Sequence, residues 1–104
     1  LLEFKLKMQI SDGPHKTEAG RLYLMYDGTH YKIGITTRDV DVRRIQIEQA
    51  EHRPLTCVWS MFSEDVFNLE HRLHQAFSSQ NVTGEWFALS DEDVRHICQL
   101  GGDV

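Results

Sequence analysis

An Asp27-Gly28 dipeptide between two runs of strand-like residues is the feature that most constrains the fold. Residues 21–26 (Arg-Leu-Tyr-Leu-Met-Tyr) and 31–36 (Tyr-Lys-Ile-Gly-Ile-Thr) are rich in aromatic and branched side chains, which favour extended structure. An Asp-Gly pair between such runs is a strong turn signal, because glycine adopts the positive φ that tight hairpin turns need. The sequence therefore predicts a β-hairpin over residues 21–36.

Side-chain alternation divides the predicted hairpin into two faces, and a two-residue or a four-residue loop gives the same division. Tyr23 lies opposite Lys32 with the shorter loop and opposite Gly34 with the longer one. One face is apolar and is predicted to pack on a core: Leu22, Leu24, Tyr26, Tyr31, Ile33 and Ile35. The other face is chemically mixed: Arg21, Tyr23, Met25, Lys32, Gly34 and Thr36.

Gly34 is the most informative residue of the mixed face. A glycine inside a strand lowers stability and usually marks the close approach of another group. Because Gly34 has no side chain, the sequence predicts a flat floor of backbone here, beside Tyr23 and Lys32, against which a substrate or an aromatic ring packs. The alternative interpretation is an ordinary solvated strand face that carries no ligand.

Apolar periodicity predicts a helix on each side of a further strand. A helix is expected over residues 37–50, capped by Thr37 or Asp39. Its apolar side is predicted to consist of Val40, Val42, Ile45 and Ile47. Alternation over residues 55–61 predicts a strand, and Ser63 is expected to cap the following helix. The apolar stripe of that helix is predicted to contain Val66, Leu69, Leu73 and Phe77.

The remaining segments complete the outline of the fold. Residues 2–10 alternate between apolar and polar side chains and predict an amphipathic strand. Residues 84–87 predict a short extended segment, and Ser90 with Asp93 three residues later predicts a capping box for the last helix. The expected fold class is therefore α+β, with a small, mainly antiparallel three-stranded sheet flanked by helices and an extra N-terminal strand.

The charge of the chain is unevenly distributed. The formal net charge is −5, which argues against a protein that grips long nucleic acid by charge alone. Residues 21–53 nevertheless carry five of the seven arginines and a net charge of +1, whereas residues 54–104 carry −6. The composition thus leaves room for chemistry at a single phosphate.

The hydropathy of the chain predicts no membrane association. No run of about 18 apolar residues occurs, so a spanning helix is excluded, and no apolar signal-peptide core is found. We therefore expect a cytoplasmic location. The chain begins at Leu1 without a methionine, and we expect it to be a piece of a longer polypeptide with further domains.

Several short motifs in a fixed order resemble the GIY-YIG nuclease superfamily. These motifs are Leu22-Tyr23-Leu24, Tyr31-Lys32-Ile33-Gly34-Ile35-Thr36, Arg43, Leu69-Glu70 with Leu73-His74 and Phe77, and Gly84-Glu85-Trp86-Phe87. They are most similar to a phage and bacterial branch with a Tyr-Lys-Ile-Gly second motif and a closing Gly-Glu-Trp-Phe. The resemblance covers residues 21–90, so we expect a nuclease domain over residues 21–100, preceded by a strand and connector over residues 1–20.

The resemblance implies hydrolysis of phosphodiester bonds, most readily in DNA, assisted by one divalent ion, Mg²⁺ or Mn²⁺. It implies that Tyr23 helps to activate the attacking water and that Arg43 contacts the phosphate. It assigns Glu70 to the metal, and Lys32 stands where a second tyrosine usually stands. Substrate contacts are also expected from three further residues, Arg21, Gly34 and Arg44.

The residues themselves support this chemistry. A planar arginine fork and a metal ion stabilise the negative charge that a phosphodiester develops in its transition state. Mg²⁺ commonly needs only one or two carboxylates, so a lone Glu70 suffices, and Glu85 is either a second acidic group at the site or a structural hydrogen-bonding residue. Lys32 is expected to act as a phosphate-binding charge or as a base, and the phenolate of Tyr23 is expected to be favoured by Lys32 and Arg43.

Other side chains near these motifs have simpler expected roles. His74 follows Glu70 at i+4, a spacing that suits a shared metal, but it is expected to be a packing or hydrogen-bonding residue. Trp59 and Trp86 are expected in the core. Either Arg43 or its neighbour Arg44 could be the phosphate contact.

Two rival functions remain open at this point. The replacement of a tyrosine by Lys32 is compatible with a catalytically inactive module that binds nucleic acid. The charge of −6 in residues 54–104 is compatible with a protein-interaction domain that binds a basic partner.

Overall fold

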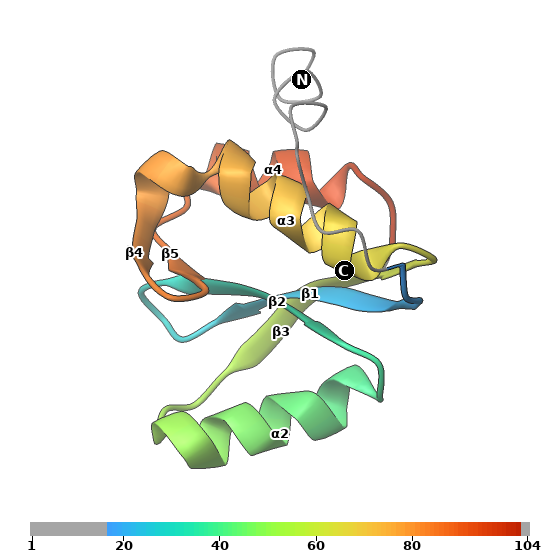
Figure 1. Cartoon of the computed structure of the whole chain (residues 1–104). Helices are drawn as coiled ribbons and strands as arrows, with labels where there is room; N and C mark the ends of the chain where they lie inside the picture. The colour runs from blue at the N-terminus through green and yellow to red at the C-terminus, as the bar shows by residue number, and fades with distance from the viewer. Residues whose placement is uncertain (1–16, 103–104) are drawn as a thin grey trace.

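A five-stranded antiparallel sheet separates two layers of helices in the computed structural model, which describes residues 17–102 (Figure 1). The strands are β1 (Gly20–Tyr26), β2 (Tyr31–Thr36), β3 (Thr56–Ser63), β4 (Asn81–Thr83) and β5 (Trp86–Phe87), in the spatial order β3-β1-β2-β5-β4. The α+β class is confirmed, but the sheet has five strands where the sequence predicted three. The strand predicted over residues 2–10 lies outside the described residues.

The predicted hairpin is present and uses the longer of its two loops. Tyr26 pairs with Tyr31, and Tyr23 pairs with Gly34. The turn is closed by Asp27, whose Oδ1 accepts hydrogen bonds from the amides of Thr29 (2.8 Å) and His30 (2.7 Å). The register fixes Tyr23 directly across from the strand glycine, as the four-residue loop requires.

Helices cover both faces of the sheet. Helix α2 (Val40–Glu51) lies below it in Figure 1, and α3 (Val66–Ala76) and α4 (Asp91–Cys98) lie above it, with a short 3₁₀ turn η1 (Ser78–Gln80) after α3. None of the helices within residues 17–102 is long and apolar enough to cross a membrane.

The helix caps follow the sequence in two of three cases. Asp39, one of two predicted residues, caps α2 and accepts from two amides of its first turn. The capping box of Ser90 and Asp93 opens α4 as predicted. The N-cap of α3 is Asp65, so the assignment of Ser63 is wrong. The Ser63 hydroxyl instead accepts from the Asp65 amide (3.1 Å), so it shapes the turn that leads into the helix.

The sheet has a core on each face. The core beneath α3 and α4 contains Leu22, Leu24, Ile33, Trp59, Val66, Leu73, Phe77, Phe87 and Ile97. The core beneath α2 contains Tyr23, Met25, Ile47, Leu55 and Trp86. The mixed face of the hairpin is therefore buried, which contradicts the solvated alternative, and both tryptophans lie in a core as predicted.

The predicted apolar side of α2 is wrong in part. Val42 and Ile45 are exposed, at 47% and 43% of their surface, whereas Ile47 is buried. The stripe that faces the sheet runs through positions 40, 43, 47 and 51, which share one helix face. Two of those positions hold Arg43 and Glu51, so polar residues take places that periodicity assigns to apolar ones.

We predict that Gly34→Ala destabilises the domain by about 1–3 kcal/mol, the usual result of overpacking a core. A Cβ atom at Gly34 would lie 2.6 Å from Cζ of Tyr23, so the ring must move. Urea denaturation measures the loss. In a Tyr23→Leu background the same substitution should cost much less, and an equal loss in both backgrounds would contradict the contact.

Candidate active site

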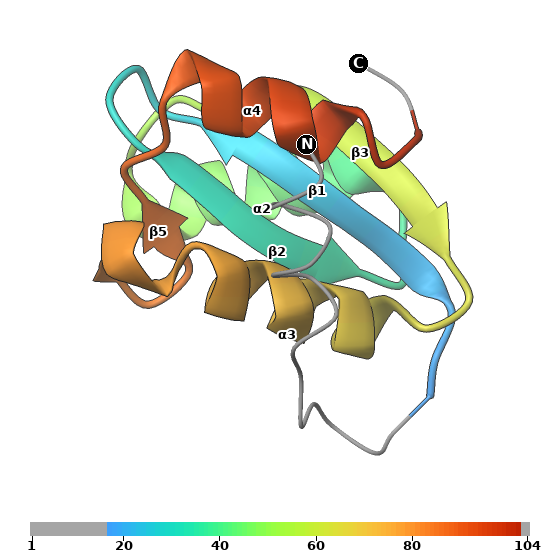
Figure 2. The same ribbon diagram turned by 90° about the horizontal axis from the view of Figure 1, so that it is seen from above.

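The site lies where strand β2 loses its neighbour in the sheet. Within β2, only Tyr31 and Lys32 pair with strand β5, and past that point α3 runs along the edge of β2 (Figure 2). His74 of α3 donates from Nε2 to the carbonyl oxygen of Ile33 (2.9 Å), and the Ile33 amide donates to the carbonyl of Glu85 (3.0 Å). The expectation that His74 is a hydrogen-bonding residue is confirmed.

This arrangement brings two carboxyl groups together beside β2. Glu70 of α3 and Glu85 of the β4–β5 turn lie beside one another. Burial, and after it the charge of Glu85 and hydrogen bonding with it, raise the pKa of Glu70 to about 7, against the opposing charge of Lys32. One oxygen of Glu70, Oε2, is buried and has no hydrogen-bond partner within residues 17–102.

Lys32 lies between carboxylates from two other elements. Its Nζ atom is 3.3 Å from Glu51 Oε2 at the end of α2 and 3.5 Å from Glu85 Oε1. The same atom lies 5.3 Å from the ring centre of Trp86. Lys32 is thus held in ion pairs with two acidic side chains, which places it as a positive charge at the site.

Tyr23 is buried on the same face of the sheet, with 1% of its surface exposed. Its ring lies over Gly34, so the floor predicted at this glycine is covered by an aromatic ring of the chain itself. Hydrogen bonding to Arg43 of α2 and the charge of Arg43 act to lower the pKa of Tyr23. Burial nevertheless dominates and raises the pKa of Tyr23 to about 12, so the expectation of a favoured phenolate is wrong.

The other arginines named from the sequence lie elsewhere. Arg44 pairs with Asp41 (2.9 Å) and Glu48 (3.0 Å) on its own helix. Arg21 donates a long hydrogen bond to Ser60 (3.4 Å) at the far end of β1. Of the two neighbouring arginines, Arg43 is the one that reaches Tyr23.

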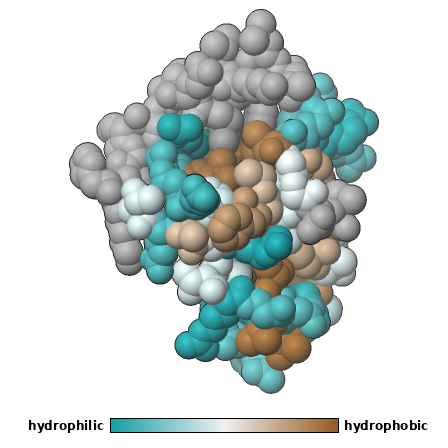
Figure 3. All heavy atoms as spheres, turned by 90° about the vertical axis from the view of Figure 1, so that its right-hand side faces the viewer, coloured by the Kyte–Doolittle hydropathy of each residue, from teal (hydrophilic) through white to brown (hydrophobic). Residues whose placement is uncertain are grey.

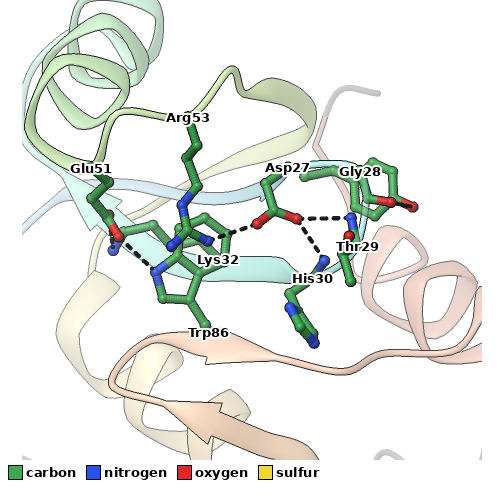
Figure 4. Close-up of polar contacts among 9 residues, drawn as sticks. Asp27, Gly28, Thr29, His30, Lys32, Glu51, Arg53 and Trp86 are labelled. Atoms are coloured by element: carbon green, nitrogen blue, oxygen red, sulfur yellow. Dashed lines mark hydrogen bonds and ion pairs between the residues drawn. The ribbon is translucent and has the colours of Figure 1, made fainter.

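A network from α2 to the hairpin turn supports the site, and sequence reasoning missed most of it (Figure 4). Glu51 accepts from Trp86 Nε1 (3.0 Å) with one oxygen and pairs with Lys32 through the other. Arg53 stacks on the Trp86 ring (4.4 Å) and pairs with Asp27 (2.7 Å). The helical spacing of Glu51 from Ile47 marks it as inward-facing, but no local signal marks Arg53.

Comparison with known families accounts for most of the described chain. Residues 17–100 match the T5orf172 domain. The chain belongs to the T5orf172 domain family. This family is related to nuclease-type domains, which agrees with the coarser part of the resemblance drawn from the motifs. The comparisons with curated proteins and with solved structures gave no match.

The T5orf172 domain offers few ligands for a metal ion. Within residues 17–102, no group of three or more His, Cys, Asp or Glu side chains is arranged to hold one. The unpaired Oε2 of Glu70 and the adjacent Glu85 carboxyl nevertheless fit a hard cation, because Mg²⁺ keeps most of its waters and needs only one or two carboxylates. A divalent ion would therefore be held by Glu70, with Glu85 beside it.

We predict that the metal-free T5orf172 domain loses stability as the pH rises from about 4.5 to 7. The raised pKa of Glu70 means that the folded state binds its proton more tightly than the unfolded chain does. Ionisation therefore costs folding free energy, of the order of 1–2 kcal/mol after allowance for solvent screening. Urea denaturation in EDTA, repeated across this pH range, measures how the free energy of unfolding changes with pH. Glu70→Gln should remove most of this pH dependence, and an unchanged dependence in that variant would contradict the assignment.

Proposed function

We propose that this T5orf172 domain is a metal-dependent endonuclease of the GIY-YIG kind that hydrolyses phosphodiester bonds in DNA. The observation that carries the proposal is the half-buried carboxyl pair of Glu70 and Glu85, which lies beside Lys32 and within electrostatic reach of Tyr23. Cationic and carboxylate groups in one half-buried place suit a reaction that needs both a metal ion and a bound anion.

Each side chain has a distinct part in this reaction. Arg43 and Lys32 supply positive charge for the non-bridging oxygens of the phosphate, where charge grows in the transition state. Glu70 would hold the divalent ion, with Glu85 beside it. An ion there would supply Lewis-acid stabilisation of the charge on the phosphate and on the leaving oxygen.

Tyr23 orients the attacking water as a neutral phenol. With a pKa near 12 it keeps its proton at neutral pH and presents an O–H donor and an acceptor lone pair. Arg43 holds the phenol oxygen from one side, and the ring cannot rotate away because it rests on Gly34. The residue is therefore a positioned hydrogen-bonding group rather than an anionic base.

A second function is favoured by the environment of Lys32. Its ion pairs with Glu51 and Glu85 stabilise the fold whether or not the site turns over substrate. A domain that kept these pairs and lost its chemistry would be an inactive module that binds nucleic acid. Such binding would be strongly dependent on salt and indifferent to divalent ions.

We predict that Glu70→Gln lowers cleavage by at least about 100-fold, because the metal supplies several kcal/mol of transition-state stabilisation. Plasmid, single-stranded DNA and RNA are incubated with Mg²⁺ or Mn²⁺, and products are quantified on gels. Glu92→Gln, on the exposed side of α4, is the matched control and should retain activity. Full activity of Glu70→Gln, or no cleavage of any substrate by the wild type, would refute the endonuclease.

A comparison of two adjacent arginines tests the phosphate contact. Arg43→Gln should reduce cleavage about 100-fold, because it removes a charged donor aimed at the phosphate. Arg44→Gln removes the same charge from the next residue and should change the rate by less than about threefold, because its guanidinium pairs with Asp41 and Glu48. Equal losses in the two variants would show that charge alone matters.

A further inference from the structure

Three surface hollows meet at the loop between β2 and α2, and Arg38 lines all of them. One of them joins Arg38 to Arg43, the arginine of the candidate active site, and to Phe67 of α3. Another joins Arg38 to Arg21 and to Phe62 of β3. Together they form a path from Arg43 to the end of the sheet.

The path is more basic than the chain as a whole. The two carboxylates beside it, Asp39 and Asp41, are already engaged. Asp39 accepts from the amides at the start of α2 (2.9 and 3.1 Å), and Asp41 pairs with Arg44 (2.9 Å). Arg38 makes no side-chain ion pair with any residue in the range 17–102, so its charge is available to an anion.

An exposed aromatic ring lies on the same path. Phe62 has 55% of its surface exposed, more than any other large hydrophobic residue within residues 17–102. It is the direct cross-strand neighbour of Arg21, so ring and guanidinium share one face of the sheet. Figure 3 looks onto this end of the sheet, where apolar surface borders hydrophilic surface above helix α2.

We propose that Arg38, Arg21 and Phe62 bind an unpaired stretch of nucleic acid next to the cleaved phosphate. The arginines follow the backbone, and Phe62 stacks on one exposed base. Proteins that bind single strands combine a basic groove with an aromatic platform in this way, whereas the bases of an intact duplex are already stacked on one another. The inference rests on the proposed nuclease function and specifies its substrate as single-stranded or locally open.

The test measures binding in the absence of cleavage. The full 104-residue chain in EDTA is titrated against a labelled single strand of about 12 nucleotides, which fits the usual site sizes, and against the same sequence as a blunt duplex. Fluorescence anisotropy gives Kd over a range of salt concentrations. The variants are Phe62→Ala and Arg38→Gln. The matched control is Val82→Ala, which truncates a similarly exposed apolar residue on β4 at the other side of the sheet.

The expected pattern separates stacking from charge. Phe62→Ala should weaken binding of the single strand by about 5- to 100-fold and change duplex binding by less than about twofold. Arg38→Gln should weaken binding of both the single strand and the duplex. It should also reduce, by about 0.7, the steepness with which the logarithm of the single-strand affinity falls with the logarithm of salt concentration. Val82→Ala should match the wild type.

The inference and the proposed function fail in different ways. Undiminished single-strand binding by Phe62→Ala, equal weakening of both substrates, or no binding of nucleic acid overturns the inference even if cleavage is observed. Binding that depends on Phe62 without any cleavage supports the binding path and counts against the endonuclease.

Discussion

The positive charge of Lys32 compensates the negative charge of the carboxylates that lie where the sheet contacts both helix layers. The rest of the site depends on this charge compensation. The ammonium of Lys32 joins Glu51 of α2 to Glu85 of the β4–β5 turn and opposes the charge of Glu70. Removing the lysine would leave these half-buried acids close together without a compensating cation, which destabilises their charged forms. The same cation serves the proposed chemistry, because a phosphate arriving at the site needs positive charge to offset the acids that hold the metal.

Helix α2 shows how the site changes the packing around it. Its inward stripe gives two of four positions to Arg43 and Glu51, and the apolar residues Val42 and Ile45 are left in solvent. Such an inversion lowers the apolar area that the helix buries, so packing alone does not explain it. Local departures from a hydrophobic pattern are typical of functional positions. Both inward polar residues contact side chains of the proposed site.

Local signals predicted the central fold, and long-range contacts decided the rest. The Asp-Gly turn sets the parity of the hairpin, and that parity alone is enough to place Tyr23, Lys32 and Gly34 on one face. Strand β5 lies within the short extended segment predicted over residues 84–87, but its two residues show no period that would assign it to the sheet, and the three-residue β4 was not predicted. The burial of Tyr23 beneath α2, and hence its high pKa, depends on a helix that follows it in sequence, so alternation alone could not predict it.

The uneven charge of the chain now has a structural reason. Most of the acidic excess lies after residue 53, and one of its members, Glu70, is the proposed metal ligand. Of the arginines of the middle segment, Arg44 pairs on its own helix, Arg53 pairs with Asp27 at the hairpin turn, and the others line the path that starts at Arg43. With a net charge of −5, the domain cannot rely on long-range attraction to hold nucleic acid. Affinity must then come from short-range contacts, and a stacked base on Phe62 supplies one that salt does not screen.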